Sequence, residues 1–143
     1  MQLSAHFSLA EVITSETAAR RGIDNTPEAQ VICNLQRLCT VLEEVRSLVG
    51  RPIRVSSGYR SQALNKAIGG SPRSAHTLGL AVDINVTGLA PSELARRIKD
   101  SEVMFDQLIL EYDQWVHFGL STQVPRRQVL TIRRGSGYLP GLV

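Results

Sequence analysis

The sequence predicts an α+β domain in which N-terminal helices pack on a small, mostly antiparallel sheet. Helical periodicity dominates the first fifty residues, whereas most later segments alternate apolar and polar residues as strands do. The 143 residues fit a single domain, spanning 1–143, that is large enough to bury about two-thirds of the surface of the unfolded chain. A chain of this size needs no disulfide to stay folded.

Three helices are expected before residue 51. "SLAE" at 8–11 has the residues of a capping box and starts a short helix, and a second short helix around "SETAARRG" ends at Gly22. The strongest pattern predicts a long helix with Thr26 as N-cap, Pro27 in the first turn and Gly50 at the exit. Its buried face should consist of Val31, Leu35, Leu38, Leu42, Val45 and Leu48.

The middle of the chain predicts two strands with a short helix between them. "PIRVSS" and "LAVDINV" alternate as strands, and "SQALNKAIGG" forms a short helix that closes on two glycines. Within "LAVDINV" one set of side chains faces the core, namely Val82, Ile84 and Val86. The intervening residues Ala81, Asp83 and Asn85 then face the other side of the sheet.

A further helix in "APSELARRIKD" precedes three more strands, "FDQLILEY", "WVHFGLS" and "QVLTIRR". The first two strands are separated by a polar turn at Asp113 and Gln114, which predicts a hairpin. Cys33 and Cys39 lie on different sides of the long helix, so we expect no disulfide between them and assign both to the core in reduced form.

The charge of the chain favours no particular partner strongly. Sixteen Lys and Arg against 13 Asp and Glu give a net charge of +3 and an isoelectric point near 9.2. No recognition motif or aromatic-interleaved basic stripe predicts binding to nucleic acid. The start has no signal-peptide pattern and no apolar run is long enough to span a bilayer. We therefore expect synthesis in the cytoplasm, no membrane insertion and a monomer.

Two histidines and an aspartate have the chemistry of a metal site. His76 precedes the "LAVDINV" strand, Asp83 lies on the non-core face of that strand, and His117 lies on a strand of the same sheet. Zinc in hydrolases usually has three such ligands and leaves a fourth position for water. Each residue alone also fits a structural role, and the interval from 76 to 83 needs a turn at Gly79. His6 has no such surroundings and is assigned a structural role.

Four segments of the chain have a recognisable combination of motifs, namely "SSGYRS", "LNKAIGG", "SAHTLGLAVDI" and "WVHFGL". Together they resemble the M15 family of zinc D-Ala-D-Ala-type peptidases, in particular its small phage and prophage murein peptidases. The family pattern Ser-x-His-x-x-Gly-x-Ala-x-Asp is complete as Ser74, His76, Gly79, Ala81 and Asp83. The resemblance implies a metal site on the sheet, with one zinc ion bound by His76, Asp83 and His117.

The resemblance also implies residues that contact the substrate. Arg60 in "SGYRS" would face the substrate and hold a carboxylate or a developing oxyanion, and a structural salt bridge is the alternative. Ser74 and Tyr59 would shape the pocket. The catalytic base of many family members lies three residues before the last histidine, where this chain has Gln114, which cannot accept the proton.

Glu111 is the expected base, with Asp113 as the alternative carboxylate. A three-residue turn at 112–114 would place Glu111 on the sheet face of His117, whereas a two-residue turn would not. Glu111 could also be an exposed carboxylate at the end of a strand.

The predicted function is hydrolysis of an amide bond in peptidoglycan stem or cross-link peptides by a zinc metallopeptidase, as a murein endopeptidase or D,D-carboxypeptidase. Because murein lies outside the membrane, we expect an endolysin released by a phage-type mechanism or a virion component that acts on the cell wall in the periplasm. The alternative is a catalytically silent, zinc-containing module for cell-wall binding or structure. Gln114 leaves this alternative open, because it stands where many family members have their catalytic base.

Overall fold

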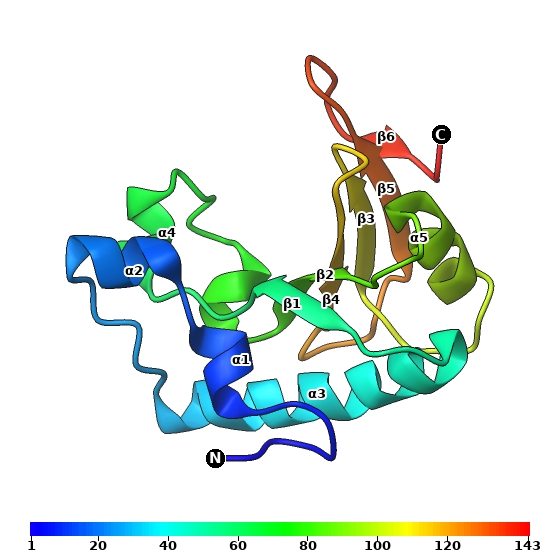
Figure 1. The fold of residues 1–143 in the computed structure, drawn as a ribbon. Coiled ribbons are helices and arrows are strands. Elements are labelled where there is room, and N and C mark those ends of the chain that lie inside the picture. Colours follow the sequence, from blue (N-terminus) through cyan, green and yellow to red (C-terminus); the bar gives the residue numbers. More distant parts are fainter.

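The computed structural model describes residues 1–143, in which helices pack around a six-stranded sheet (Figure 1). The helices are α1 (Leu9–Ile13), α2 (Glu16–Arg21), α3 (Ala29–Val49), α4 (Gln62–Ala67), the 3₁₀ helix η1 (Ala75–Leu78) and α5 (Pro91–Lys99). The strands are β1 (Arg54–Ser57), β2 (Ala81–Asn85), β3 (Gln107–Glu111), β4 (Trp115–Gly119), β5 (Gln128–Ile132) and β6 (Leu139–Pro140). The predicted α+β class is confirmed.

The sheet has the order β1-β2-β4-β3-β5-β6, and every neighbouring pair is antiparallel except β3 and β5. Strand β4 pairs with β2 on one side and β3 on the other, so both of its edges are occupied. The chain that leaves β4 extends the sheet beyond β3, and the connection at 120–127 returns it so that β5 runs parallel to β3. The parallel pair and the short strand β6 were not expected from the sequence.

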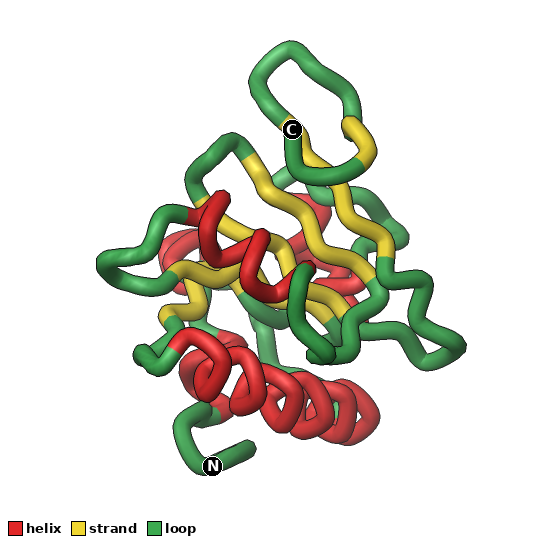
Figure 2. The backbone as a smooth tube through the Cα atoms, turned by 90° about the vertical axis from the view of Figure 1, so that its right-hand side faces the viewer, coloured by secondary structure: helices red, strands yellow, loops and turns green.

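One face of the sheet forms the core with α3 and α5. Val82, Ile84 and Phe118 on this face are completely buried, as the alternating pattern of β2 predicted. Figure 2 shows the long helix α3 along one end of the molecule and α5 packed across the strands. The loop between β5 and β6 projects away from this body in both views. The opposite face of β2, β3 and β4 does not take part in this core.

The boundaries of α3 differ from the expectation. The helix begins at Ala29 with Glu28 at the N-cap, two residues later than the predicted N-cap Thr26. The backbone N–H of Thr26 donates to the side chain of Asp24, so residues 24–26 form a turn before the helix. At the other end Val49 is buried and Leu48 is 40% exposed. Burial follows the alternating steps of three and four residues that keep one helix face inward.

Other local predictions are confirmed with one exception. Ser8 and Glu11 form the capping box of α1, and Gly22 and Gly50 end α2 and α3 in the left-handed conformation. Cys39 is buried and both cysteines are free, but Cys33 is exposed, which corrects its assignment to the core. No helix has the length and apolar character needed to cross a membrane.

Candidate metal centre

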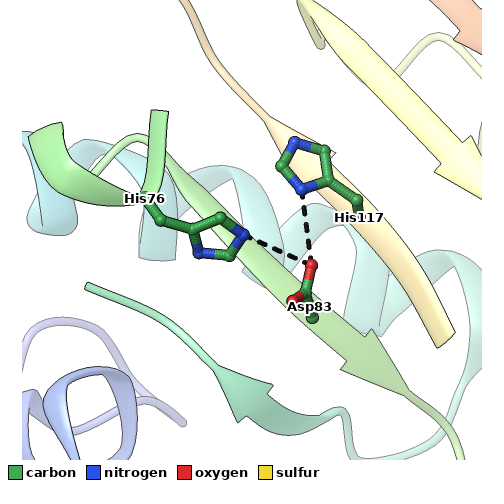
Figure 3. Close-up of side chains that lie close together, drawn as sticks. All are labelled: His76, Asp83 and His117. Atoms are coloured by element: carbon green, nitrogen blue, oxygen red, sulfur yellow. Dashed lines mark ion pairs between the residues drawn. The ribbon is translucent and has the colours of Figure 1, made fainter. Parts of the chain in front are cut away.

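Two neighbouring strands and a 3₁₀ helix bring His76, Asp83 and His117 together. Asp83 on β2 is the direct cross-strand partner of His117 on β4, so both side chains leave the sheet on the face opposite the core. His76 lies on η1, which ends two residues before β2 begins. Figure 3 shows the two imidazoles converging on one carboxylate oxygen of Asp83. The structure thus places together the three predicted ligands.

The separations within this cluster suit a tetrahedral metal ion. Asp83 Oδ1 lies 3.4 Å from His76 Nε2 and 3.3 Å from His117 Nδ1, and the three candidate ligand atoms all lie within 4.8 Å of one another. Ligands that are each about 2.0–2.2 Å from a tetrahedral ion are roughly 3.3–3.6 Å apart. The two contacts to Asp83 fall within this interval.

The ring of His76 is oriented by a backbone carbonyl. Its Nδ1 lies 2.8 Å from the carbonyl oxygen of Gly58, and an Nδ1–H donor at this contact leaves the lone pair of Nε2 directed at Asp83. Gly58 is itself packed so closely on α1 that a Cβ atom would overlap the backbone of Val12. The absence of a side chain at position 58 therefore helps to set the tautomer of His76.

Gly79 makes the turn that the sequence interval required. It ends η1 with φ +71°, a left-handed conformation that costs other residues free energy, and its N–H donates to the carbonyls of Ala75 and His76. A Cβ at this position would lie 2.8 Å from Cγ1 of Val31 on α3. Both the backbone angle and the close packing explain why glycine stands between His76 and Asp83.

The carboxylate of Asp83 lacks the partners that a buried anion needs. Its Oδ1 is buried and makes no hydrogen bond. Burial opposes ionisation, but the adjacent His117 and His76 outweigh it and hold the pKa of Asp83 well below its usual range. A buried, ionised oxygen between two imidazole nitrogens is a set of donors that fits a divalent cation such as zinc.

These residues line a cavity of about 580 Å³ that also contains Arg60 and Ser74. The guanidinium of Arg60 donates to Oγ of Ser74 at 3.4 Å, its Nε is buried without a partner, and it forms no salt bridge. Burial lowers the pKa of Arg60, and the charges of Asp83 and Glu111 oppose this shift. Arg60 is therefore a cation without a paired carboxylate, so the salt-bridge alternative is wrong.

The turn between β3 and β4 has three residues, 112–114, and this decides the position of Glu111. Glu111 pairs with Trp115 and Ile109 pairs with His117, so Glu111 lies on the same face as His117 and lines the same cavity. Burial raises the pKa of Glu111, and the neighbouring imidazole of His117 opposes this. Glu111 therefore has the position that a candidate base requires, on the sheet face of His117.

Four other residues that the sequence singled out lie outside this cavity. Asp113 and Gln114 are exposed in the turn, and Asp113 pairs with Arg133 at 3.1 Å. Tyr59 is buried in the core and does not line this cavity, so its expected contribution to the pocket stays a prediction. The backbone N–H of Tyr59 donates to the carbonyl of Val12, and this hydrogen bond fixes the residue against α1. His6 pairs with Glu43 and joins the N-terminus to α3.

Among the further residues that line the cavity are two aromatic side chains that the sequence did not indicate as functional. Trp115 lies two positions before His117 and so on the same strand face, a relation that the alternating pattern could have revealed. Tyr138 reaches the cavity from the loop before β6, and no sequence periodicity connects it with the site.

A sheet that presents a His, Asp and His cluster inside an open cavity is the arrangement of a metal-dependent hydrolase. The family model described as Peptidase M15 matches residues 5–119, and the chain belongs to this peptidase family. The family defines it as a metallopeptidase, a hydrolase of peptide bonds. None of the curated proteins matches the chain significantly. Strands β5 and β6, and with them Tyr138, lie beyond the matched residues.

Proposed function

We propose that the protein is a zinc metallopeptidase that cleaves an amide bond in the stem or cross-link peptides of peptidoglycan. The observation that carries this proposal is the cluster of His76, Asp83 and His117 in the cavity that Arg60 and Glu111 also line. One zinc ion per chain would be held by the three clustered side chains. When bound, zinc supplies a Lewis acid that polarises the substrate carbonyl and makes water acidic enough to lose a proton near neutral pH.

Glu111 is the proposed general base. Its carboxylate accepts a proton from the attacking water and passes it to the leaving nitrogen, so the amide and water become a carboxylic acid and an amine, which ionise to carboxylate and ammonium. Burial and the raised pKa of Glu111 bring its basicity closer to the pH at which such an enzyme works. Asp113 is not suited to this role, because its side chain is exposed and paired with Arg133.

Arg60 is the proposed anion-binding residue. Its guanidinium lines the cavity without a paired carboxylate and can donate hydrogen bonds to a substrate carboxylate or to the oxyanion that forms during attack. Ser74 accepts from Arg60 and also receives the N–H of His76, so it links the anion site to the candidate metal ligand.

The proposed substrate is a peptidoglycan peptide, because such peptides carry free carboxylates that suit a cavity with an unpaired arginine and a metal ion. The place of action would then be the cell wall, reached by phage-type release or as part of a virion, with the protein acting as a monomer. No interaction with nucleic acid is required.

The direct test combines metal analysis with murein digestion. Purified protein should contain about one zinc ion per chain and release new amino groups from purified peptidoglycan, and His76→Ala should lose both properties. Mass spectrometry of the released muropeptides identifies the bond that is cut. Stoichiometric zinc without turnover of any muropeptide would instead favour a silent wall-binding module.

A further inference from the structure

Trp115 is hydrogen-bonded to the proposed base. Its indole Nε1–H donates to Oε1 of Glu111 at 2.7 Å, and the two residues face each other as the last cross-strand pair of the β3–β4 hairpin. Both side chains line the cavity. Glu111 has no other side-chain hydrogen bond. One carboxylate oxygen is therefore held by the indole while the other remains available for proton transfer.

The indole is itself supported by the turn. The rings of Tyr112 and Trp115 are 5.6 Å apart at an angle of 56°, so the exposed Tyr112 packs beside Trp115. Tyr112 and Asp113 have φ values of 57° and 53°, which cost a residue with a side chain about 1–2 kcal/mol each. Such a conformation persists where surrounding contacts maintain it, and it is frequent at functional sites.

Two contacts to β5 and the segment after it maintain this turn. The N–H of Tyr112 donates to the carbonyl of Ile132 at 2.8 Å, and Arg133 binds the carboxylate of Asp113. The turn, the indole and the Glu111 carboxylate therefore form one connected unit. Its anchor in β5 lies outside the part of the chain that matches the peptidase family.

We propose that Trp115 is a positioning residue that fixes the orientation of the Glu111 carboxylate for proton transfer; this rests on the proposed function of Glu111. A glutamate has three rotatable bonds, and its terminal torsion is broad, so a carboxylate without a fixed partner samples several orientations. A donated N–H also favours the ionised form that a base requires. Trp115 would thus act through Glu111 without contacting the reacting atoms.

The test is Trp115→Phe, which keeps an aromatic ring and removes the N–H donor. We expect kcat on a muropeptide to fall about 10- to 100-fold, the range for losing a hydrogen bond to a charged group, with KM changed less than about twofold. Zinc content should stay at one per chain. Gln114→Ala is the matched control, because Gln114 lies in the same turn, is exposed and does not line the cavity.

A double-mutant cycle separates positioning from a general structural effect. If Trp115 acts through Glu111, Trp115→Phe should cost almost nothing further when added to Glu111→Gln. The acidic limb of the pH profile should also move to higher pH in Trp115→Phe, because the ionised carboxylate loses a donor. The ionisable groups that face Glu111 are His76, Asp83, His117, Arg60 and Tyr138, and this variant leaves all of them in place.

The outcomes distinguish this inference from the proposed function. An inactive Glu111→Gln together with a fully active Trp115→Phe would refute the role of Trp115 and leave the function of Glu111 intact. An active Glu111→Gln would refute the base itself. Equal losses from Trp115→Phe in the wild-type and Glu111→Gln backgrounds would show that the indole supports the site in another way.

Discussion

Replacing Gly79 with alanine should destabilise the protein and weaken metal binding at the same time. The new Cβ would lie 2.8 Å from Val31 Cγ1, 3.0 Å from Val31 O and 3.1 Å from Leu35 Cγ, and φ is +71°. The left-handed backbone costs alanine about 1–2 kcal/mol, and overpacking against a helix costs about 1–3 kcal/mol. The sum, about 2–5 kcal/mol, is a large part of a typical free energy of unfolding of about 5–15 kcal/mol.

Gly50→Ala provides the matched control for this prediction. Gly50 has φ +66° and a Cβ added to it would meet no atom within 4 Å, so its substitution carries the backbone cost alone. Urea unfolding of the two variants measures the difference, with an unchanged m-value as the check on two-state behaviour. Zinc titration of Gly79→Ala should also show an affinity about tenfold lower or more, since η1 carries His76. Equal destabilisation of the two variants would refute the proposed contact with α3.

Three further predictions concern the cavity and the sheet. Because burial raises the pKa of Glu111, the acidic limb of kcat/KM should lie above the ordinary glutamate value of about 4.3, and a limb below that value would contradict this base. Tyr138→Ala should raise KM for muropeptides more than it lowers kcat, because Tyr138 lines the cavity without belonging to the candidate metal cluster; unchanged kinetics on every muropeptide would exclude a substrate contact. Arg126 binds Asp106 through two side-chain contacts and lowers its pKa, so Arg126→Met should lose up to about 1 kcal/mol of stability at neutral pH. This carboxylate contribution is present above pH ~4 and is lost as pH falls through the lowered pKa, so thermal melts of the variant and wild type should converge in acid.

Local signals were sufficient for much of the fold, and they placed Asp83 on the sheet face where the candidate metal cluster lies. The alternation of "LAVDINV" assigned Val82 and Ile84 to the core and Asp83 to the opposite face, and the structure agrees. The capping box at Ser8 and the terminal glycines also form as predicted. These features depend on neighbours a few residues apart, which is why a sequence contains them.

The sequence was less informative about which side chains each segment would contact. The pattern of α3 did not reveal that Asp24 would bind the Thr26 N–H and delay the helix, or that Leu48 would face solvent. Tyr59 lies in a segment that also contains Arg60, yet one is drawn under α1 while the other lines the cavity. The local sequence cannot tell which of two adjacent side chains will be buried, because the orientation of each side chain depends on the segments that pack against it.

The sequence by itself determined that His76, Asp83 and His117 form one candidate set and that a turn at Gly79 must join the first two. Only the tertiary structure decided which carboxylate accompanies them. Three turn residues rather than two place Glu111 on the face of His117, because side chains alternate along a strand and one extra residue reverses the face. That choice is made by left-handed angles at Tyr112 and Asp113 and by contacts to β5, which residues within the hairpin alone do not reveal.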